Sequence, residues 1–131
     1  MLECLIVGDS IAVGTHRVRP ECVSLSRGGI NSRDWNKQNA GNSITARTVI
    51  ISLGSNDYKG IQTEAELQKL RELTKADRVF WILPAIKPAV QDTVRSIAAK
   101  YGDTVIPITG LQKDGVHPNV AGYQAIGTAT R

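Results

Sequence analysis

The sequence predicts an α/β protein: a three-layer α/β/α sandwich with a central, mostly parallel sheet of five strands. Two observations support this fold class. Short apolar runs, each typical of a strand that is buried on both faces, recur along the chain. Segments with the apolar spacing of amphipathic helices lie between several of them. Strands that alternate with helices indicate a parallel sheet covered by helices on both faces.

Five apolar runs, most of them ending at Gly, Pro or a polar turn, are predicted to be strands: Leu2–Val7, Val23–Ser26, Thr48–Leu53, Arg78–Leu83 and Thr104–Ile108. The third run has the strongest signal and the second the weakest. The fifth contains Pro107, which cannot donate a ladder hydrogen bond, so we expect this strand to be short or at an edge of the sheet.

Two helices are predicted in the second half of the chain. One is expected from about Glu64 to Lys75, where Thr63 and Glu66 have the spacing of a capping box. The next has a regular apolar stripe, with Pro88 in its first turn and a Gly stop after it: Val90, Val94, Ile97, Ala98 and Tyr101.

A last helix is predicted after Pro118. Asn119 can cap its first turn, and the helix is expected to continue through Ala129. Its spacing predicts that Val120, Tyr123 and Ala129 face inward.

Length and composition limit the kinds of protein that this chain can be. It has 131 residues, of which 41% are hydrophobic and 21% charged, values that are typical of one globular domain spanning residues 1–131. The formal net charge is +4, but the charges are scattered, so nucleic acid is not an expected partner. No apolar run reaches the roughly 20 residues that a membrane span needs.

The N-terminal sequence and the two cysteines bear on processing and redox state. Met1 to Cys4 contains no basic residue, which argues against a signal peptide, so we expect an unprocessed protein that is cytoplasmic or associated with a phage virion. Cys4 and Cys22 lack metal-ligand spacing and are too few for a disulfide framework, so we expect both to be reduced core residues. A bridge between them requires that their strands be neighbours, and this alternative stays open.

Residues that can carry chemistry follow the predicted strands, which is where ligands bind in parallel α/β sheets. Ser10 follows the first strand on a tight Gly-Asp-Ser turn, which can expose the hydroxyl above the sheet. Gly28 and Gly29 follow the second strand and allow the backbone to approach a ligand closely. Asn56 follows the third strand, and its amide can donate a hydrogen bond to an oxyanion.

Near the C-terminus, Asp114 and His117 lie three residues apart. A carboxylate that orients one ring nitrogen of a histidine leaves the other nitrogen free to accept a serine proton. Each of these features also has an ordinary structural interpretation, such as an N-cap, a turn or a surface histidine. Together they supply a nucleophile, a base, an orienting carboxylate and oxyanion donors, a combination that favours a hydrolytic site. His16, the other histidine, is expected to be structural or exposed.

These residues resemble the four sequence blocks of the SGNH/GDSL hydrolase family. The similarity runs from Leu5 to Tyr123 and is carried by four segments: Gly8-Asp9-Ser10-x-x-x-Gly14, Gly29, Val49 to Asp57, and Asp114 to Tyr123. The resemblance implies a flavodoxin-like α/β fold. It also implies a catalytic triad of Ser10, Asp114 and His117, with an oxyanion hole formed by Ser10, Gly29 and Asn56.

The chain departs from the family pattern in two respects. The second block usually carries an Asn five residues before its glycine, and here that position is Ser24. The chain is also short for the family, which suggests that the segments around the substrate are trimmed. Asp9 and Asp57 are expected to fix the site loops by hydrogen bonds rather than to act as acids.

The function implied by the resemblance is that of a serine esterase acting on short-chain acyl esters, with acetylated carbohydrate as a candidate substrate and no cofactor or metal. Few aromatic residues remain outside the core pattern, and the segments that could wall the site are brief and polar, so a shallow pocket is expected: Asn31–Asn42, Tyr58–Gln62 and Ala85–Lys87. One alternative is a catalytically silent module of the same fold that binds a glycan or another ligand. A second is a nucleotide or phosphate binder that uses the glycine turns as an anion site and leaves His117 without a role.

Overall fold

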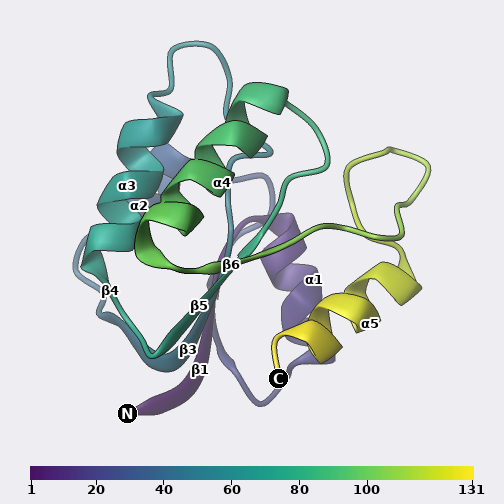
Figure 1. The fold of residues 1–131 in the computed structure, drawn as a ribbon, viewed down its shortest axis with the longest axis horizontal. Coiled ribbons are helices and arrows are strands. Elements are labelled where there is room, and N and C mark those ends of the chain that lie inside the picture. Colours follow the sequence, from purple (N-terminus) through teal and green to yellow (C-terminus); the bar gives the residue numbers. More distant parts are fainter.

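The computed structural model describes all 131 residues and contains a six-stranded sheet with helices on both faces (Figure 1). In chain order the elements are β1 (Leu2–Gly8), α1 (Ser10–Val18), β2 (Val23–Ser26), α2 (Ser32–Gln38), β3 (Ile44–Ser52), α3 (Thr63–Leu73), β4 (Thr74–Lys75), β5 (Arg78–Ile82), α4 (Pro88–Tyr101), β6 (Thr104–Ile106) and α5 (Val120–Ala129). No helix is long and apolar enough to cross a membrane.

The sheet has the strand order β2-β1-β3-β5-β6, and every pair of neighbouring strands is parallel. The predicted fold class is therefore confirmed, but the prediction of five strands was wrong. The sixth strand, β4, has two residues and pairs with Ile44 and Thr45. This pairing exists because β3 begins at Ile44, four residues before the predicted start, where Ile44 and Ala46 are buried and Arg47 is exposed.

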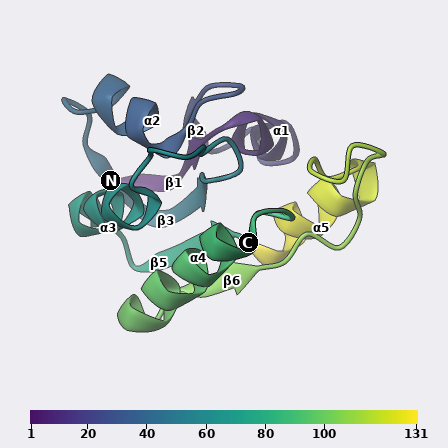
Figure 2. The same ribbon diagram turned by 90° about the horizontal axis from the view of Figure 1, so that it is seen from above.

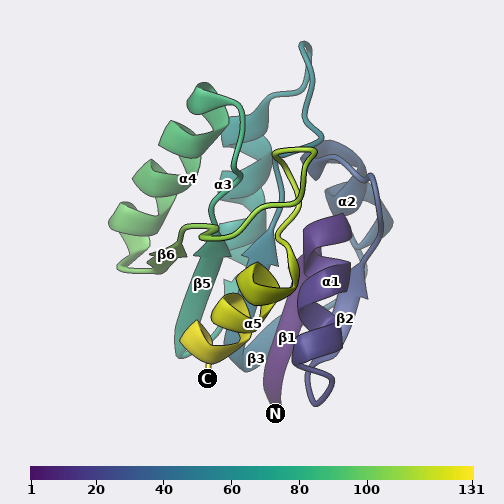
Figure 3. The same ribbon diagram turned by 90° about the vertical axis from the view of Figure 1, so that its right-hand side faces the viewer.

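Two cores, one on each face of the sheet, hold the layers together. On one face, side chains from β1, β3 and β5 pack against α2, α3 and α4, around Trp35 and Trp81. On the other face, α1 and α5 pack against the sheet and against each other through residues such as Ile11 and Ile126. Figure 2 shows the layers edge-on, and Figure 3 shows α1 and α5 side by side in front of the strands.

The structure corrects several predictions about the helices. The segment after Ser10, for which no helix was predicted, is helix α1, and part of the polar segment Asn31–Asn42 is helix α2. Both helices are short, and α2 has few apolar residues, so neither gives a clear periodic signal. The capping box at Thr63 is absent, because this residue is already inside α3 and its hydroxyl donates to Asp57 instead.

Helix α5 begins as predicted, and Tyr123 packs against the core as predicted, but the two other residues that were expected to face inward do not. Asn119 caps it, with its side-chain oxygen accepting a hydrogen bond from the Gly122 N–H at 2.8 Å. The prediction that Val120 and Ala129 face inward was wrong: Val120 is 75% exposed and Ala129 is also exposed. Ile126 takes the buried position on this helix, because it lies on the face that meets the sheet.

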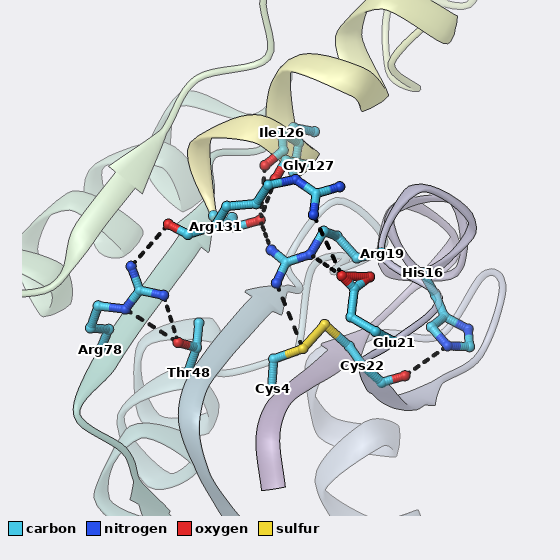
Figure 4. Close-up of polar contacts among 11 residues, drawn as sticks. Cys4, His16, Arg19, Glu21, Cys22, Thr48, Arg78, Ile126, Gly127 and Arg131 are labelled. Carbon is cyan, nitrogen blue, oxygen red and sulfur yellow. Dashed lines mark hydrogen bonds and ion pairs between the residues drawn. A yellow bond between two sulfur atoms is a disulfide. The ribbon is translucent and has the colours of Figure 1, made fainter.

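The expectation of two reduced cysteines was also wrong, since Cys4 and Cys22 form a disulfide. Their strands are neighbours in the sheet, with Leu5 of β1 aligned with Val23 of β2, so the two side chains meet. Figure 4 shows the buried Arg19 guanidinium beside this disulfide, reaching from Cys4 toward the end of α5, where it donates to the Thr130 hydroxyl at 2.6 Å. The disulfide and Arg19 thus tie β1, β2 and α5 together near the amino-terminal ends of the strands, opposite the loops that follow their carboxyl ends.

Candidate active site

The predicted site residues lie in loops at the carboxyl edge of the sheet. Ser10 is the first residue of α1 and is separated from the end of β1 by Asp9 alone. Gly8 makes the close turn before it, because a Cβ on Gly8 would lie 1.8 Å from the Ser52 carbonyl oxygen and its φ of +140° disfavours other residues. The end of β1 therefore packs directly against the end of β3 and fixes where Ser10 emerges.

Ser10, His117 and Asp114 form a continuous chain of hydrogen bonds. The Ser10 Oγ lies 2.7 Å from His117 Nε2, and His117 Nδ1 lies 2.7 Å from Asp114 Oδ2. An ionised carboxylate can only accept, so Nδ1 carries the proton and Nε2 is left to accept from the Ser10 hydroxyl. In Figure 3 the loop before α5 crosses the carboxyl edge of the sheet, which brings His117 to a residue that is 107 positions away in the sequence.

The Asp114 carboxylate is strongly favoured in its ionised form. Its Oδ1 accepts the backbone N–H of His117 at 3.0 Å and that of Val116 at 2.9 Å. These two backbone hydrogen bonds, and then the bond from the His117 side chain, lower the pKa of Asp114 to about 2. The carboxylate is therefore charged at any pH at which the histidine is neutral and able to accept a proton.

Contact between α1 and α5 brings the two halves of this hydrogen-bonded chain together. Tyr123 of α5 packs directly over Gly14, where an added Cβ would lie within 2.3 Å of the tyrosine ring. Only glycine leaves room for the ring at this point. The first and last of the four sequence segments are thus in physical contact, one supplying Ser10 and the other His117.

Gly29 and Asn56 lie in the two neighbouring loops. Gly29 has a φ of +76°, a left-handed conformation that favours glycine, and the preceding Gly28 borders the nucleophile, with its ideal Cβ position 4.0 Å from the Ser10 Cβ. One N–H of the Asn56 side chain donates to the Ile30 carbonyl at 3.1 Å. This bond joins the two loops and leaves the second amide N–H of Asn56 free to donate.

Asp57 anchors the Asn56 loop, as expected from the sequence. Its carboxylate accepts from the Ser32 N–H at 2.8 Å, from the Ser32 hydroxyl at 2.6 Å and from the Thr63 hydroxyl at 2.7 Å. The loop that carries Asn56 is therefore tied to the start of α2 and to the start of α3.

Asp9 fixes the Ser10 turn from inside the protein. It caps α1 by accepting the Ile11 N–H at 3.0 Å, and the same oxygen accepts the Ser52 hydroxyl at 3.0 Å. Its other oxygen is buried without a partner. Burial is the main cause that raises the pKa of Asp9 to about 6, while the bonds from Ser52 and Ile11 lower it.

Asp9→Asn is expected to change how stability depends on pH. Because the pKa of Asp9 in the folded protein, about 6, lies above the ordinary value of 3.8, its contribution to stability is complete below about pH 4 and is lost as pH rises through about 6. This difference corresponds to about 3 kcal/mol. Urea unfolding at pH 4 and at pH 7.5 should therefore show the variant gaining about that much relative to wild type at the higher pH. A difference between the two proteins that stays constant with pH would contradict this.

Two residues that contribute to the site were not found from the sequence. Ser52 bonds Asp9, and Lys87 donates to the carbonyl oxygens of the Asn56 loop. For Ser52 a usable signal exists, since a hydroxyl at the end of an otherwise apolar buried strand needs a polar partner. His16 lies apart from the site, and its ring bonds the Cys22 carbonyl at 2.9 Å. Of the two roles expected for it, structural or exposed, this contact supports the structural one.

The side chains of Ser10 and His117 are both partly exposed. None of the five main surface cavities is lined by Ser10 or His117. No group of three or more His, Cys, Asp or Glu side chains is arranged to hold a metal ion. The site as it stands offers a serine hydroxyl bonded to an oriented imidazole, beside backbone and side-chain N–H groups.

Comparison by sequence finds no matching family model and no matching curated protein. Comparison by structure finds proteins of the same fold. A candidate acylhydrolase from Bacteroides fragilis has a TM-score of 0.68 and 21% identity, over 96% of this chain and 83% of the other. A candidate GDSL-like lipase from Parabacteroides merdae has a TM-score of 0.73 and 15% identity, over 97% and 92%.

A third similar structure is the C-terminal catalytic domain of peptidoglycan O-acetyltransferase A from Streptococcus pneumoniae, determined with a methylsulfonyl adduct. Its TM-score is 0.62 at 17% identity, over 98% of this chain and 91% of the other. The chain therefore has the α/β fold of these acylhydrolase, lipase and acetyltransferase structures, as its resemblance to the SGNH/GDSL hydrolases implied.

Proposed function

We propose that this chain is a serine esterase that hydrolyses short-chain acyl esters through Ser10, His117 and Asp114. The observation that carries the proposal is the unbroken hydrogen-bonded chain from the Ser10 hydroxyl through the His117 ring to Asp114. Similarity in fold to acylhydrolase and acetyltransferase structures supports acyl chemistry at this edge of the sheet.

In the proposed reaction, the Ser10 oxygen attacks the ester carbonyl while His117 Nε2 takes its proton. Asp114 holds Nδ1–H and stabilises the imidazolium that forms. The tetrahedral intermediate collapses as His117 gives its proton to the departing alcohol, and an acyl group stays on Ser10. Water, activated by the same imidazole, then releases the acid and restores the serine.

Three N–H groups are assigned to the oxyanion: the backbone amides of Ser10 and Gly29 and the side chain of Asn56. The Ser10 amide lies at the N-terminus of α1, where the helix dipole favours negative charge. One donor of this kind is typically worth about 3 kcal/mol in the transition state. A catalytically silent binding module would not need an imidazole held in this tautomer.

The substrate class that we propose is a small acyl group, above all acetyl, on a polar alcohol such as a sugar. The partial exposure of Ser10 and His117 supports this, together with the fact that neither residue lines any of the five main cavities. The loop that carries Asn56 is polar next to this residue: Arg33 of α2 donates to the hydroxyl of the exposed Tyr58, two residues after Asn56, at 3.0 Å. Polar loops suit a hydrated alcohol better than a lipid.

We expect turnover of p-nitrophenyl acetate and butyrate, with kcat/KM falling or constant as the acyl chain lengthens from two to about twelve carbons. Each methylene that entered an apolar tunnel would add roughly 0.8 kcal/mol of binding, or about fourfold in kcat/KM. Steady-state rates across the ester series measure this directly. Absence of turnover with every ester would favour the silent binding module, and a steady rise toward the longest ester would contradict the shallow site.

A further inference from the structure

Lys87 reaches from the turn between β5 and α4 to the loop that carries Asn56. Its ammonium group donates to the Ser55 carbonyl at 2.7 Å and to the Asp57 carbonyl at 2.5 Å. These two carbonyls belong to the residues on either side of Asn56. No backbone N–H bonds either carbonyl, so Lys87 supplies the hydrogen bonds that hold these two peptide groups.

The backbone of Lys87 is unusual for a lysine. It is the only residue other than glycine with a positive φ, at 65°, a conformation that glycine or asparagine adopts more easily. It also occupies the N-cap position of α4, where Ser, Thr, Asp and Asn are preferred, and its side chain makes no capping bond. Lys87 thus departs from the residue preferences for a positive φ and for an N-cap, while its side chain bonds a loop of the site. This combination favours a role in the site over a role in the turn alone.

The other restraints on the loop leave a specific task for Lys87. The Asp57 side chain anchors the far end of the loop to Ser32, and the Asn56 side chain is oriented by the Ile30 carbonyl. The Ser55 hydroxyl is buried without a partner and contributes no anchor. The Asp57 N–H donates to the Gly54 carbonyl at 3.1 Å and closes the turn around Ser55 and Asn56. The carbonyls of Ser55 and Asp57 on either side of Asn56 are bonded by the Lys87 ammonium, which adds the restraint that this turn lacks.

We propose that Lys87 is a positioning residue for the reaction, which acts through Asn56. By fixing the peptides of Ser55 and Asp57, it holds the free N–H of the Asn56 amide in the direction of the oxyanion. This inference rests on the proposed esterase function. Misplacing a donor by about 1 Å can cost a factor of about 100 in rate, so a residue that acts only through position can have a large effect.

The test combines Lys87→Met with Asn56→Ala in a double-mutant cycle. Lys87→Met alone should lower kcat for p-nitrophenyl acetate roughly 10- to 100-fold, with little change in KM. In protein that already carries Asn56→Ala, the same substitution should change kcat by less than about twofold, because the donor that Lys87 positions is gone. Full activity of Lys87→Met, or an equal loss in both backgrounds, would overturn the proposal.

Two further variants separate position from folding. Lys87→Gly suits the positive φ and should keep the fold, yet it should lose as much kcat as Lys87→Met, because it too lacks the ammonium. Lys69→Met, which removes an exposed lysine on α3 away from the site loops, should keep wild-type kcat. If wild type hydrolyses no ester, or if Ser10→Ala stays active, the proposed function fails; if activity depends on Ser10 but not on Lys87, only this inference fails.

Discussion

Ser10→Ala is expected to reduce ester hydrolysis to background, a loss of at least about 10⁴-fold in kcat. The hydroxyl is the only group on α1 that bonds His117, and no covalent acyl intermediate can form without it. Folding should be unaffected, because alanine is a good helix former and the capping bond to α1 comes from Asp9. Rates with p-nitrophenyl acetate, together with thermal unfolding of the variant, measure both parts of this expectation.

A labelling experiment supports the interpretation of the Ser10 variant. A sulfonyl fluoride, which transfers its sulfonyl group to an activated serine oxygen with loss of fluoride, should modify wild type once and leave Ser10→Ala unmodified. Ser96→Ala, on the exposed face of α4, serves as the matched control and should behave like wild type in both assays. Mutant activity within a few-fold of wild type, on protein with an unchanged melting curve, would exclude Ser10 as the nucleophile.

Asp114→Asn is expected to lower kcat by about 10³- to 10⁴-fold while leaving the loop intact. The amide oxygen of asparagine can still accept the N–H groups of Val116 and His117, so the turn is kept. The amide nitrogen then faces His117 Nδ1, which must become an acceptor, and the proton moves to Nε2. In that tautomer the ring cannot accept the Ser10 proton.

Rates at several pH values and a matched variant check this mechanism. Asp92→Asn removes a surface carboxylate that pairs with Arg95 three residues away on α4, and it should leave kcat unchanged. Wild-type activity should not be lost through neutralisation of Asp114 at ordinary assay pH, because the pKa of this carboxyl is lowered to about 2 and it remains charged. A kcat for Asp114→Asn close to that of wild type would show that the carboxylate does not set the tautomer.

The sequence allowed the fold class and the grouping of the site residues to be predicted because both depend on local signals. Buried parallel strands are marked by their apolar runs, and residues that follow such strands must meet at one edge of the sheet. Ser10, Gly29 and Asn56 were found in this way, whereas His117 was found from its spacing to Asp114. Their roles in catalysis stay predictions, whereas their positions at that edge are now described.

The features that were missed depend on long-range contacts. Strand β4 forms only because Ile44 lies beside it, and the disulfide forms only because β1 and β2 are neighbours. Lys87 gives no signal in the sequence, since a lysine before a proline at a helix start is ordinary on its own. Its backbone conformation and its two carbonyl partners become visible only when the turn after β5 is placed beside the loop after β3.

The division of the protein into two cores has a consequence for how refolding can be followed. Both tryptophans, Trp35 and Trp81, are buried on the face covered by α2, α3 and α4, whereas Ser10 and His117 meet only when α5 docks against α1 on the opposite face. Tryptophan fluorescence and regained activity therefore report the assembly of two different layers. Any kinetic lag between the two signals measures the time that the C-terminal helix needs to join an already packed sheet.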